Sequence, residues 1–207
     1  MSDEFADTTI VLYTIGHSNH SWEHFRDLLG RAGIETLVDV RSQPYSRYTE
    51  HFSAKPLRSA VEAAGLRYVF QGEALGGRPD GGEYYDEEGR VRYYEVARSS
   101  AFLSGIDALL EEAGQRRAAM MCAEENPESC HRRLLIARVL QDRGVRIRHV
   151  RGDGRIQTEE ELTAEIDAKN PKAKQLDLFG SPKDMESEWK SSRSVLPKHP
   201  PENFLRN

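Results

Sequence analysis

Short apolar runs alternate along the chain with longer segments whose apolar residues recur every three or four positions. A short, nearly continuous apolar run is typical of a strand that is buried on both faces of a sheet. Five such runs lie at residues 8–15, 36–40, 66–70, 118–123 and 145–150. Recurrence every three or four positions instead predicts an amphipathic helix, and Trp22, Phe25 and Leu29 follow it between the first two runs.

Further helices are expected between and after the later apolar runs. They are predicted at residues 54–64, 93–113, 127–143 and 159–167. Asn126 is expected to cap the third of these, with Pro127 at its first position. Because strands that alternate with helices favour a parallel sheet covered on both faces, we expect an α/β fold. Its sheet would be mostly parallel, five-stranded and flanked by helices, in a single Rossmann-like domain.

The apolar periodicity stops near residue 168. Residues 169–207 hold five of the nine prolines and no periodic pattern, so we expect an α/β domain at residues 1–168 followed by a flexible tail. The tail has eight Lys or Arg against five Asp or Glu, which leaves a net charge of −8 on the domain in a chain of net charge −5. An acidic domain has no general affinity for nucleic acid, so any such binding requires a local basic patch.

The N-terminus and the length of the apolar runs bear on location. Residues 1–9 are acidic and polar, unlike a signal peptide, and no apolar run approaches the roughly 18 residues of a membrane span. We therefore expect a soluble, cytoplasmic protein that does not bind membranes. In a reducing cytosol, the two cysteines, Cys122 and Cys130, favour reactive or ligating thiols over a structural disulfide.

Polar side chains directly follow four of the predicted strands. In chain order they are His17 and Ser18, Asp39 and Arg41, Gln71 and Glu73, and Cys122 and Glu124. The ligand crevice of a mostly parallel sheet lies beyond the carboxyl ends of its strands. The sequence therefore predicts one polar site at this edge of the sheet.

The segment from the fourth strand to the next helix carries the reactive groups. Cys130 is expected in the first helical turn, where free backbone N–H groups and the helix dipole favour a thiolate, and His131 adds to this effect. Either Cys122 or Cys130 would be the nucleophile or a ligand, with Glu124 as acid or base and His17 as proton carrier. Two alternatives stay open. In the first, both thiols are inert buried side chains. In the second, both cysteines bind zinc together with His17 and His131, although the spacing of these residues matches no standard zinc module.

A second group of residues is suited to binding an anion. The guanidinium groups of Arg41 and Arg132 can hold a phosphate or a developing negative charge, and an Asp39–Arg41 pair that only shapes its loop is the alternative. Residues 75–92 form a long loop rich in glycine and tyrosine, which predicts a lid or binding loop unless it is disordered. The expected substrate- or phosphate-binding residues are Ser18, Asp39, Arg41, Arg47, Gly76, Gly77 and Arg132.

The tail holds one short motif, made of Gln175, Leu176, Asp177, Leu178 and Phe179. It resembles the bacterial sliding-clamp-binding motif, which implies the sliding clamp as a partner. A short apolar anchor in a flexible segment is suited to folding into a groove on another protein. A chance match, or an apolar patch that docks back onto the domain, is the alternative.

Several motifs of the domain occur in the order of a known family. They are Thr14 to Ser18, Asp39 to Arg41, Leu75 to Gly77, Cys122 to Glu124, Cys130 to Arg132, and His149 to Val150. Over about residues 10–150 the chain resembles the bacterial domain-of-unknown-function 488 family. The resemblance implies a fold and a site at these motifs, and it names neither a reaction nor a cofactor.

Two weaker resemblances suggest chemistry. Asp39 to Arg41 followed by a strand-end Cys122 resembles rhodanese-like sulfurtransferases, but Ala-Glu-Glu stands where they have an anion-binding loop. Cys130 to Arg132 resembles the Cys-His-Arg of DNA alkylguanine alkyltransferases, with Ser129 in place of their proline. We therefore expect a DNA repair or modification enzyme that is recruited by the sliding clamp and acts on DNA or a nucleotide. The alternatives are a sulfurtransferase or phosphate-handling enzyme, and a non-catalytic adaptor that binds nucleic acid.

Overall fold

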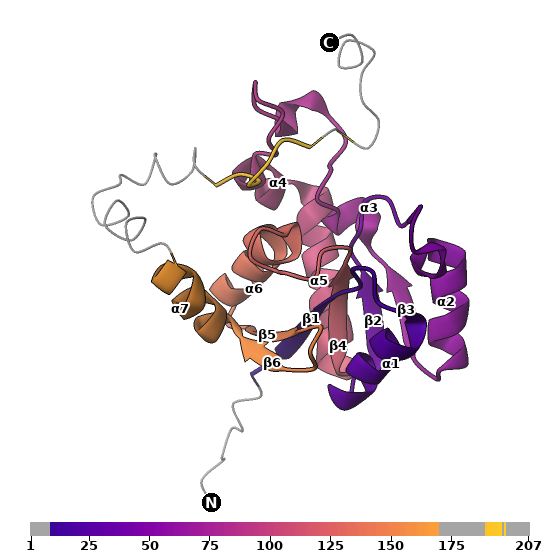
Figure 1. Ribbon diagram of the computed structural model, residues 1–207. Helices are drawn as coiled ribbons and strands as arrows, with labels where there is room; N and C mark the ends of the chain where they lie inside the picture. The colour runs from indigo at the N-terminus through magenta and orange to yellow at the C-terminus, as the bar shows by residue number, and fades with distance from the viewer. Residues whose placement is uncertain (1–8, 170–188, 196, 198–207) are drawn as a thin grey trace, which may run out of the picture.

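One six-stranded sheet organises the computed structural model, which describes residues 9–169, 189–195 and 197. The strands are β1 (Val11–Gly16), β2 (Thr36–Asp39), β3 (Arg67–Phe70), β4 (Ala118–Cys122), β5 (Arg146–Val150) and β6 (Ile156–Thr158), in the order β3-β2-β4-β1-β5-β6 (Figure 1). The first five are parallel, and β6 pairs antiparallel with β5. The predicted α/β class is confirmed, but the count of five strands was wrong. The missed strand, β6, has only three residues and no apolar run.

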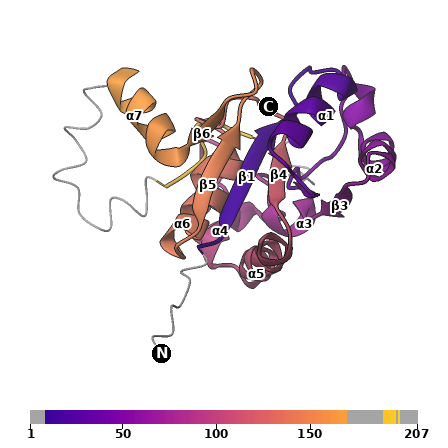
Figure 2. The ribbon, with the colours of Figure 1, turned by 90° about the horizontal axis from the view of Figure 1, so that it is seen from below.

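Helices cover both faces of the sheet (Figure 2). On one face lie α1 (Trp22–Arg31) and α2 (Ala54–Ala63), whose buried side chains share an apolar core with Ala119 and Met121 of β4. On the other face, α4 (Tyr93–Arg98), α5 (Ser100–Gln115), the π-helical segment η3 (Arg132–Ala137) and α6 (Arg138–Asp142) pack with Ala118 and Met120. Alternate residues of β4 thus enter opposite cores, which explains why the strand is apolar throughout. The last helix, α7 (Glu159–Lys169), lies against β5 and β6.

Three predicted segments differ in detail. The helix expected over residues 127–143 with Asn126 as its cap begins only at η3, with His131 as its N-cap, and continues into α6. The helix expected over residues 93–113 is divided at Ser99, whose extended backbone ends α4 and whose hydroxyl accepts from the backbone N–H of Phe102 to cap α5. The loop after β3 contains α3 (Gly72–Leu75), the short turn η2 (Gly82–Tyr84) and an antiparallel bridge between Tyr85 and Val91. This loop is therefore folded against the domain.

Part of the segment that was expected to be a flexible tail packs against the domain. The indole N–H of Trp189 donates to the carbonyl of Leu134 at 2.7 Å, and the guanidinium of Arg138 lies 4.4 Å above the indole ring. Ser191 donates its backbone N–H to Val91 and accepts the backbone N–H of Val91 on its hydroxyl, both at 2.9 Å. We call residues 189–195 the strap. The clamp-like motif at residues 175–179 lies outside the described residues.

Within the part of the chain that the structure describes, no helix is long and apolar enough to cross a membrane.

Candidate functional site

A cavity of about 390 Å³ opens at the carboxyl ends of the parallel strands. Its wall includes His17 after β1, Arg41 after β2, and Cys122 at the end of β4. His131, just before η3, and Tyr93, at the start of α4, complete this part of the wall. The cavity thus gathers polar residues from three strand ends, which is where ligands bind in open α/β sheets.

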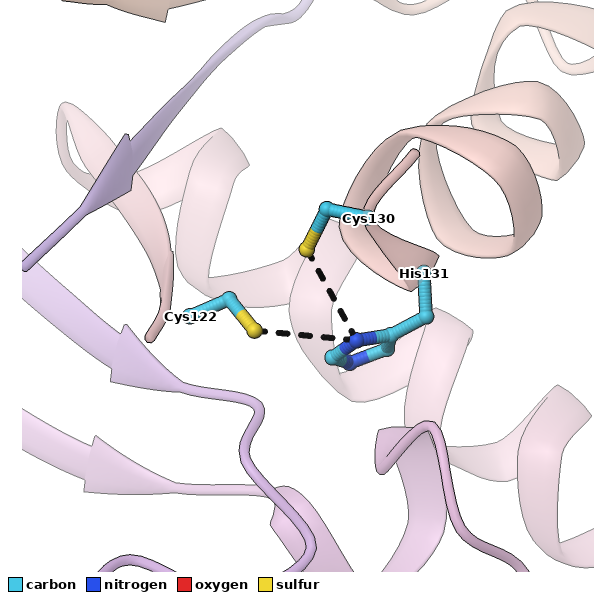
Figure 3. Close-up of side chains that lie close together, drawn as sticks. All are labelled: Cys122, Cys130 and His131. Atoms are coloured by element: carbon cyan, nitrogen blue, oxygen red, sulfur yellow. Dashed lines mark hydrogen bonds between the residues drawn. The ribbon is translucent and has the colours of Figure 1, made fainter. Parts of the chain in front are cut away.

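Two thiols and one imidazole form a cluster at the cavity (Figure 3). Nδ1 of His131 lies 3.7 Å from Sγ of Cys122 and 3.9 Å from Sγ of Cys130. On the other side of the ring, Nε2 lies 3.0 Å from the carbonyl oxygen of Val40. Because a carbonyl oxygen only accepts, Nε2 must carry the proton, and in the neutral ring Nδ1 directs its lone pair at the two sulfurs.

The two thiols differ in environment. A hydrogen bond from the Cys130 thiol, followed by the nearby imidazole of His131 and guanidinium of Arg132, holds the pKa of Cys122 below its ordinary value. Burial and the neighbouring Cys122 raise the pKa of Cys130. Cys122 also lines the cavity, whereas Cys130 is only 1% exposed behind it. The sequence left both cysteines open as the nucleophile, and the geometry favours Cys122 as the thiolate and Cys130 as its hydrogen-bond donor.

A chain of charged and polar groups holds Arg41 in the cavity wall. The buried Asp39 accepts from Nε and Nη2 of Arg41 at 2.8 and 2.6 Å and from the hydroxyl of Tyr68 at 2.8 Å. Nη1 of Arg41 donates to Nε2 of His17 at 3.0 Å, and Nδ1 of His17 donates to the carbonyl of Ser18 at 2.8 Å. The site therefore presents a fixed guanidinium whose orientation two further side chains determine.

His17 does not have the geometry of the proton carrier expected from the sequence. Both ring nitrogens already have partners, and burial together with the charge of Arg41 lowers the pKa of His17 to about 4. The ring is therefore neutral near pH 7 and acts as an acceptor that orients Arg41. Ser18, which accepts from the ring, has a positive φ of 45°, a conformation that non-glycine residues adopt rarely.

The two glycines expected at a binding loop instead permit close packing around the cavity. A Cβ on Gly77 would lie 2.7 Å from Cγ of His131, and one on Gly76 would lie 2.3 Å from Oγ of Ser42. That hydroxyl accepts from the backbone N–H of Arg78 at 2.9 Å. Gly77 therefore lets the loop support the imidazole face directly, and it also lines the cavity.

Arg132 is not an anion-binding group in this structure, in contrast to its expected role. Its side chain is 1% exposed and donates to the carbonyls of Glu124 and Glu125 and to the hydroxyl of Thr14. The guanidinium thus fixes the loop that follows β4 and lies outside the cavity wall. Arg47, also expected to bind phosphate, follows the cavity residue Ser46 and is not part of the wall.

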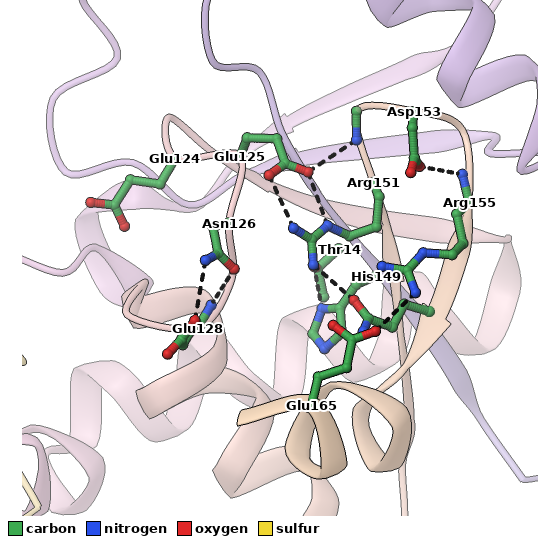
Figure 4. Close-up of polar contacts among 12 residues, drawn as sticks. Thr14, Glu124, Glu125, Asn126, Glu128, His149, Arg151, Asp153, Arg155 and Glu165 are labelled. Carbon is green, nitrogen blue, oxygen red and sulfur yellow. Dashed lines mark hydrogen bonds and ion pairs between the residues drawn. The ribbon is translucent and has the colours of Figure 1, made fainter. Parts of the chain in front are cut away.

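The two glutamates after β4 point in different directions (Figure 4). Glu125 accepts from Nε and Nη2 of Arg151 at 2.9 and 3.1 Å and from the backbone N–H of Gly152 at 3.0 Å, so it is a structural group. Glu124 lines the cavity and forms an ion pair with Arg193 of the strap. The candidate acid or base is therefore engaged by a strap residue.

Sequence reasoning missed the contribution of the strap and of Tyr93. Ser191, Ser192, Arg193 and Val195 line the cavity although they follow the domain boundary drawn from composition. The one local signal was Trp189, a large apolar residue in an otherwise polar segment, which anchors the strap on η3. Burial, followed by the neighbouring Cys130 and Cys122, raises the pKa of Tyr93.

Comparison with known proteins gives a family and nothing finer. The family model described as "Domain of unknown function DUF488" matches residues 21–139, which include Arg41, Cys122, Cys130 and His131. No curated protein and no solved structure matches the chain.

Proposed function

The chain belongs to the family described as Domain of unknown function DUF488, and we propose that it is a DNA repair or modification enzyme with Cys122 as its nucleophile. The observation that carries this proposal is the position of the Cys122 sulfur. It lies in the cavity wall, 3.7 Å from Nδ1 of His131, with the more deeply buried Cys130 beside it. The Nδ1 lone pair of His131 is placed to take the Cys122 thiol proton, and the resulting thiolate accepts from the imidazolium; a thiol and a base paired in this way at a concave site are the arrangement of nucleophilic catalysis.

In the proposed step, the Cys122 thiolate donates an electron pair to an electrophilic carbon of a modified base or nucleotide. A carbon–sulfur bond forms while the bond from that carbon to its leaving atom breaks, and the leaving atom takes the electron pair. The guanidinium of Arg41, fixed by Asp39 and His17, faces the same cavity and stabilises negative charge on the substrate.

The size and rim of the cavity support a nucleic-acid substrate. A cavity of about 390 Å³ suits a single base or nucleoside, the unit that DNA-modifying enzymes extract from a duplex. Tyr45 and Tyr48 are 74% and 92% exposed, and Tyr45 lines the cavity, so their rings are available for stacking on bases. Arg78 also lines it and supplies local positive charge in an acidic domain.

Recruitment by the bacterial sliding clamp through residues 175–179 is part of the same proposal, as is a cytoplasmic location. In the sequence the motif lies between α7, which ends at Lys169, and the strap, which begins ten positions after Phe179 and lines the cavity. Binding of the full chain to a purified clamp, with Gln175→Ala/Phe179→Ala as the control, tests this part separately from the chemistry.

The proposed chemistry is tested with a panel of oligonucleotides that carry alkylated or deaminated bases. The wild-type chain is expected to process at least one of them, and Cys122→Ser to lose that activity. Cys130→Ser is the matched control because it removes a neighbouring thiol that does not line the cavity, and it should retain part of the activity. Full activity in a folded Cys122→Ser variant would refute the nucleophile.

The sulfurtransferase hypothesis is less well supported by the geometry. A persulfide on Cys122 would face the Cys130 sulfur, and a neighbouring thiol is positioned to displace it. Incubation with thiosulfate followed by mass spectrometry distinguishes the two hypotheses, because a stable persulfide on Cys122 favours sulfur transfer.

A further inference from the structure

We propose that Cys122, Cys130 and His131 bind a zinc ion whose fourth coordination position opens into the cavity. The two sulfur atoms and Nδ1 of His131 all lie within 4.8 Å of one another. They meet although Cys122 ends β4 and the other two residues precede η3, so the ligand set forms by folding and not by a short sequence motif. This proposal goes beyond the proposed function and does not depend on its substrate.

The two sulfur–nitrogen separations are close to those of a tetrahedral zinc site. Zinc–sulfur and zinc–nitrogen bonds of about 2.3 and 2.05 Å place a sulfur and a nitrogen ligand roughly 3.6 Å apart. The structure has 3.7 Å from Cys122 and 3.9 Å from Cys130 to Nδ1 of His131. For a bound ion, these two sulfur–nitrogen distances therefore need to change by only a few tenths of an ångström.

The imidazole is already oriented as a ligand. Its Nε2–H donates to the carbonyl of Val40, which leaves the Nδ1 lone pair directed at the sulfurs. Histidine ligands of zinc are held in this manner, with the second ring nitrogen bonded to a carbonyl or carboxylate. Gly77 packs against the ring so closely that a Cβ would collide with it, which limits rotation away from the cluster.

The chemistry of the donors selects a soft or borderline cation. Two thiolates and one imidazole suit zinc far better than magnesium or calcium, which take oxygen ligands. Two thiolates also neutralise the charge of a divalent ion, so the complex adds no net charge to a largely buried place. The thiols release their protons on binding, and Cys122 remains a thiolate, so a bound ion is compatible with its proposed role as nucleophile.

The fourth coordination position of the zinc ion would face the cavity. Cys122 and His131 line the cavity, and Cys130 lies behind them. Three protein ligands with one open position are typical of catalytic zinc sites, whereas structural sites have four. The open position is therefore expected to hold water or a substrate atom.

The test is metal binding by the reduced full-length chain, with Zn²⁺ for content and Co²⁺ as a spectroscopic probe. After incubation with Zn²⁺ and desalting, elemental analysis should find one equivalent in the wild type. Co²⁺ should give the intense visible and thiolate charge-transfer bands of a tetrahedral sulfur site. Cys122→Ser, Cys130→Ser and His131→Gln should each weaken Zn²⁺ binding by at least about tenfold, as expected for loss of a direct ligand.

His17→Gln is the matched control, since it alters a second histidine of the cavity wall that is not part of the cluster. This variant should retain the metal and the Co²⁺ spectrum. Absence of both signals in the folded wild-type chain would overturn the proposal, as would undiminished binding by the three ligand variants. Neither result depends on activity toward DNA. If the proposed function fails its test, the zinc proposal still stands, and if no metal binds, the proposed function still stands.

Discussion

The buried polar groups on two sides of the cavity differ in how closely they are hydrogen-bonded. On the side of β1 and β2, Asp39, Arg41, Tyr68 and His17 form a network of hydrogen bonds of 2.6–3.0 Å. On the side of β4 and η3, the sulfurs of the cluster lie 3.7 and 3.9 Å from the imidazole, with its lone pair directed at them. We infer that the first side is a rigid support that positions the guanidinium of Arg41, whereas the second side, with its two thiols, is the reactive one.

Asp39→Ala tests the rigid side and should have the largest effect. The substitution leaves the guanidinium of Arg41 and the hydroxyl of Tyr68 buried without their acceptor. Removing one partner of a buried ion pair costs about 3–5 kcal/mol, so the free energy of unfolding should fall by that amount in urea titrations. Tyr68→Phe, which removes one neutral hydrogen bond, should cost only about 1 kcal/mol. Equal, small losses in both variants would contradict a rigid network.

The pH dependence of stability should report His17. Its pKa is about 4 in the folded protein and about 6.5 when unfolded, so the unfolded state binds the extra proton between these values. The contribution of His17 to the free energy of unfolding is therefore fully present above pH 6.5. It is lost as the pH drops toward 4, which lowers the free energy of unfolding by about 3 kcal/mol. Comparing the wild type with His17→Gln isolates this contribution, since the variant should lose less stability over the same range. Parallel curves would show that His17 is not held neutral.

Alkylation should separate the two thiols of the reactive side. In metal-free protein, iodoacetamide should modify Cys122 at least about tenfold faster than Cys130, because Cys122 lines the cavity and has the more stabilised thiolate. Peptide mapping at short times measures the ratio. Faster labelling of Cys130 would reverse the assignment of roles.

Arg193→Ala should have the smallest effect on stability. The Arg193 side chain is 69% exposed, and ion pairs at such positions contribute roughly 0–1 kcal/mol. The variant frees the Glu124 carboxylate, so a change in KM for the substrate with little change in the unfolding midpoint is expected. A loss of several kcal/mol would show that the strap is a structural element of the domain.

The sequence predicted the framework better than the details of the site. Short apolar runs located five strands, and the rule for strand ends placed His17, Arg41 and Cys122 near one another. The position of Arg132 outside the cavity wall could not be predicted because its partners include the backbone carbonyls of Glu124 and Glu125, which no residue pattern reveals.

The strap was missed for a related reason. Its contacts join residues far apart in the sequence, such as Trp189 with Leu134, 55 positions apart, and Ser191 with Val91, 100 positions apart, so composition alone assigned it to the tail. The Cys122, Cys130 and His131 cluster likewise depends on the orientation of one imidazole, which the carbonyl of Val40 sets from a different strand end.

The central claim, that Cys122 is the nucleophile of a cavity that accepts a base, is most directly tested by covalent capture. An oligonucleotide with an electrophilic chloroacetamide on one extruded base is incubated with the full chain, and the adduct is located by peptide mapping. The account predicts a single adduct on Cys122, which disappears in Cys122→Ser and persists in Cys130→Ser. An adduct on Cys130, or equal capture by Cys122→Ser, would contradict it.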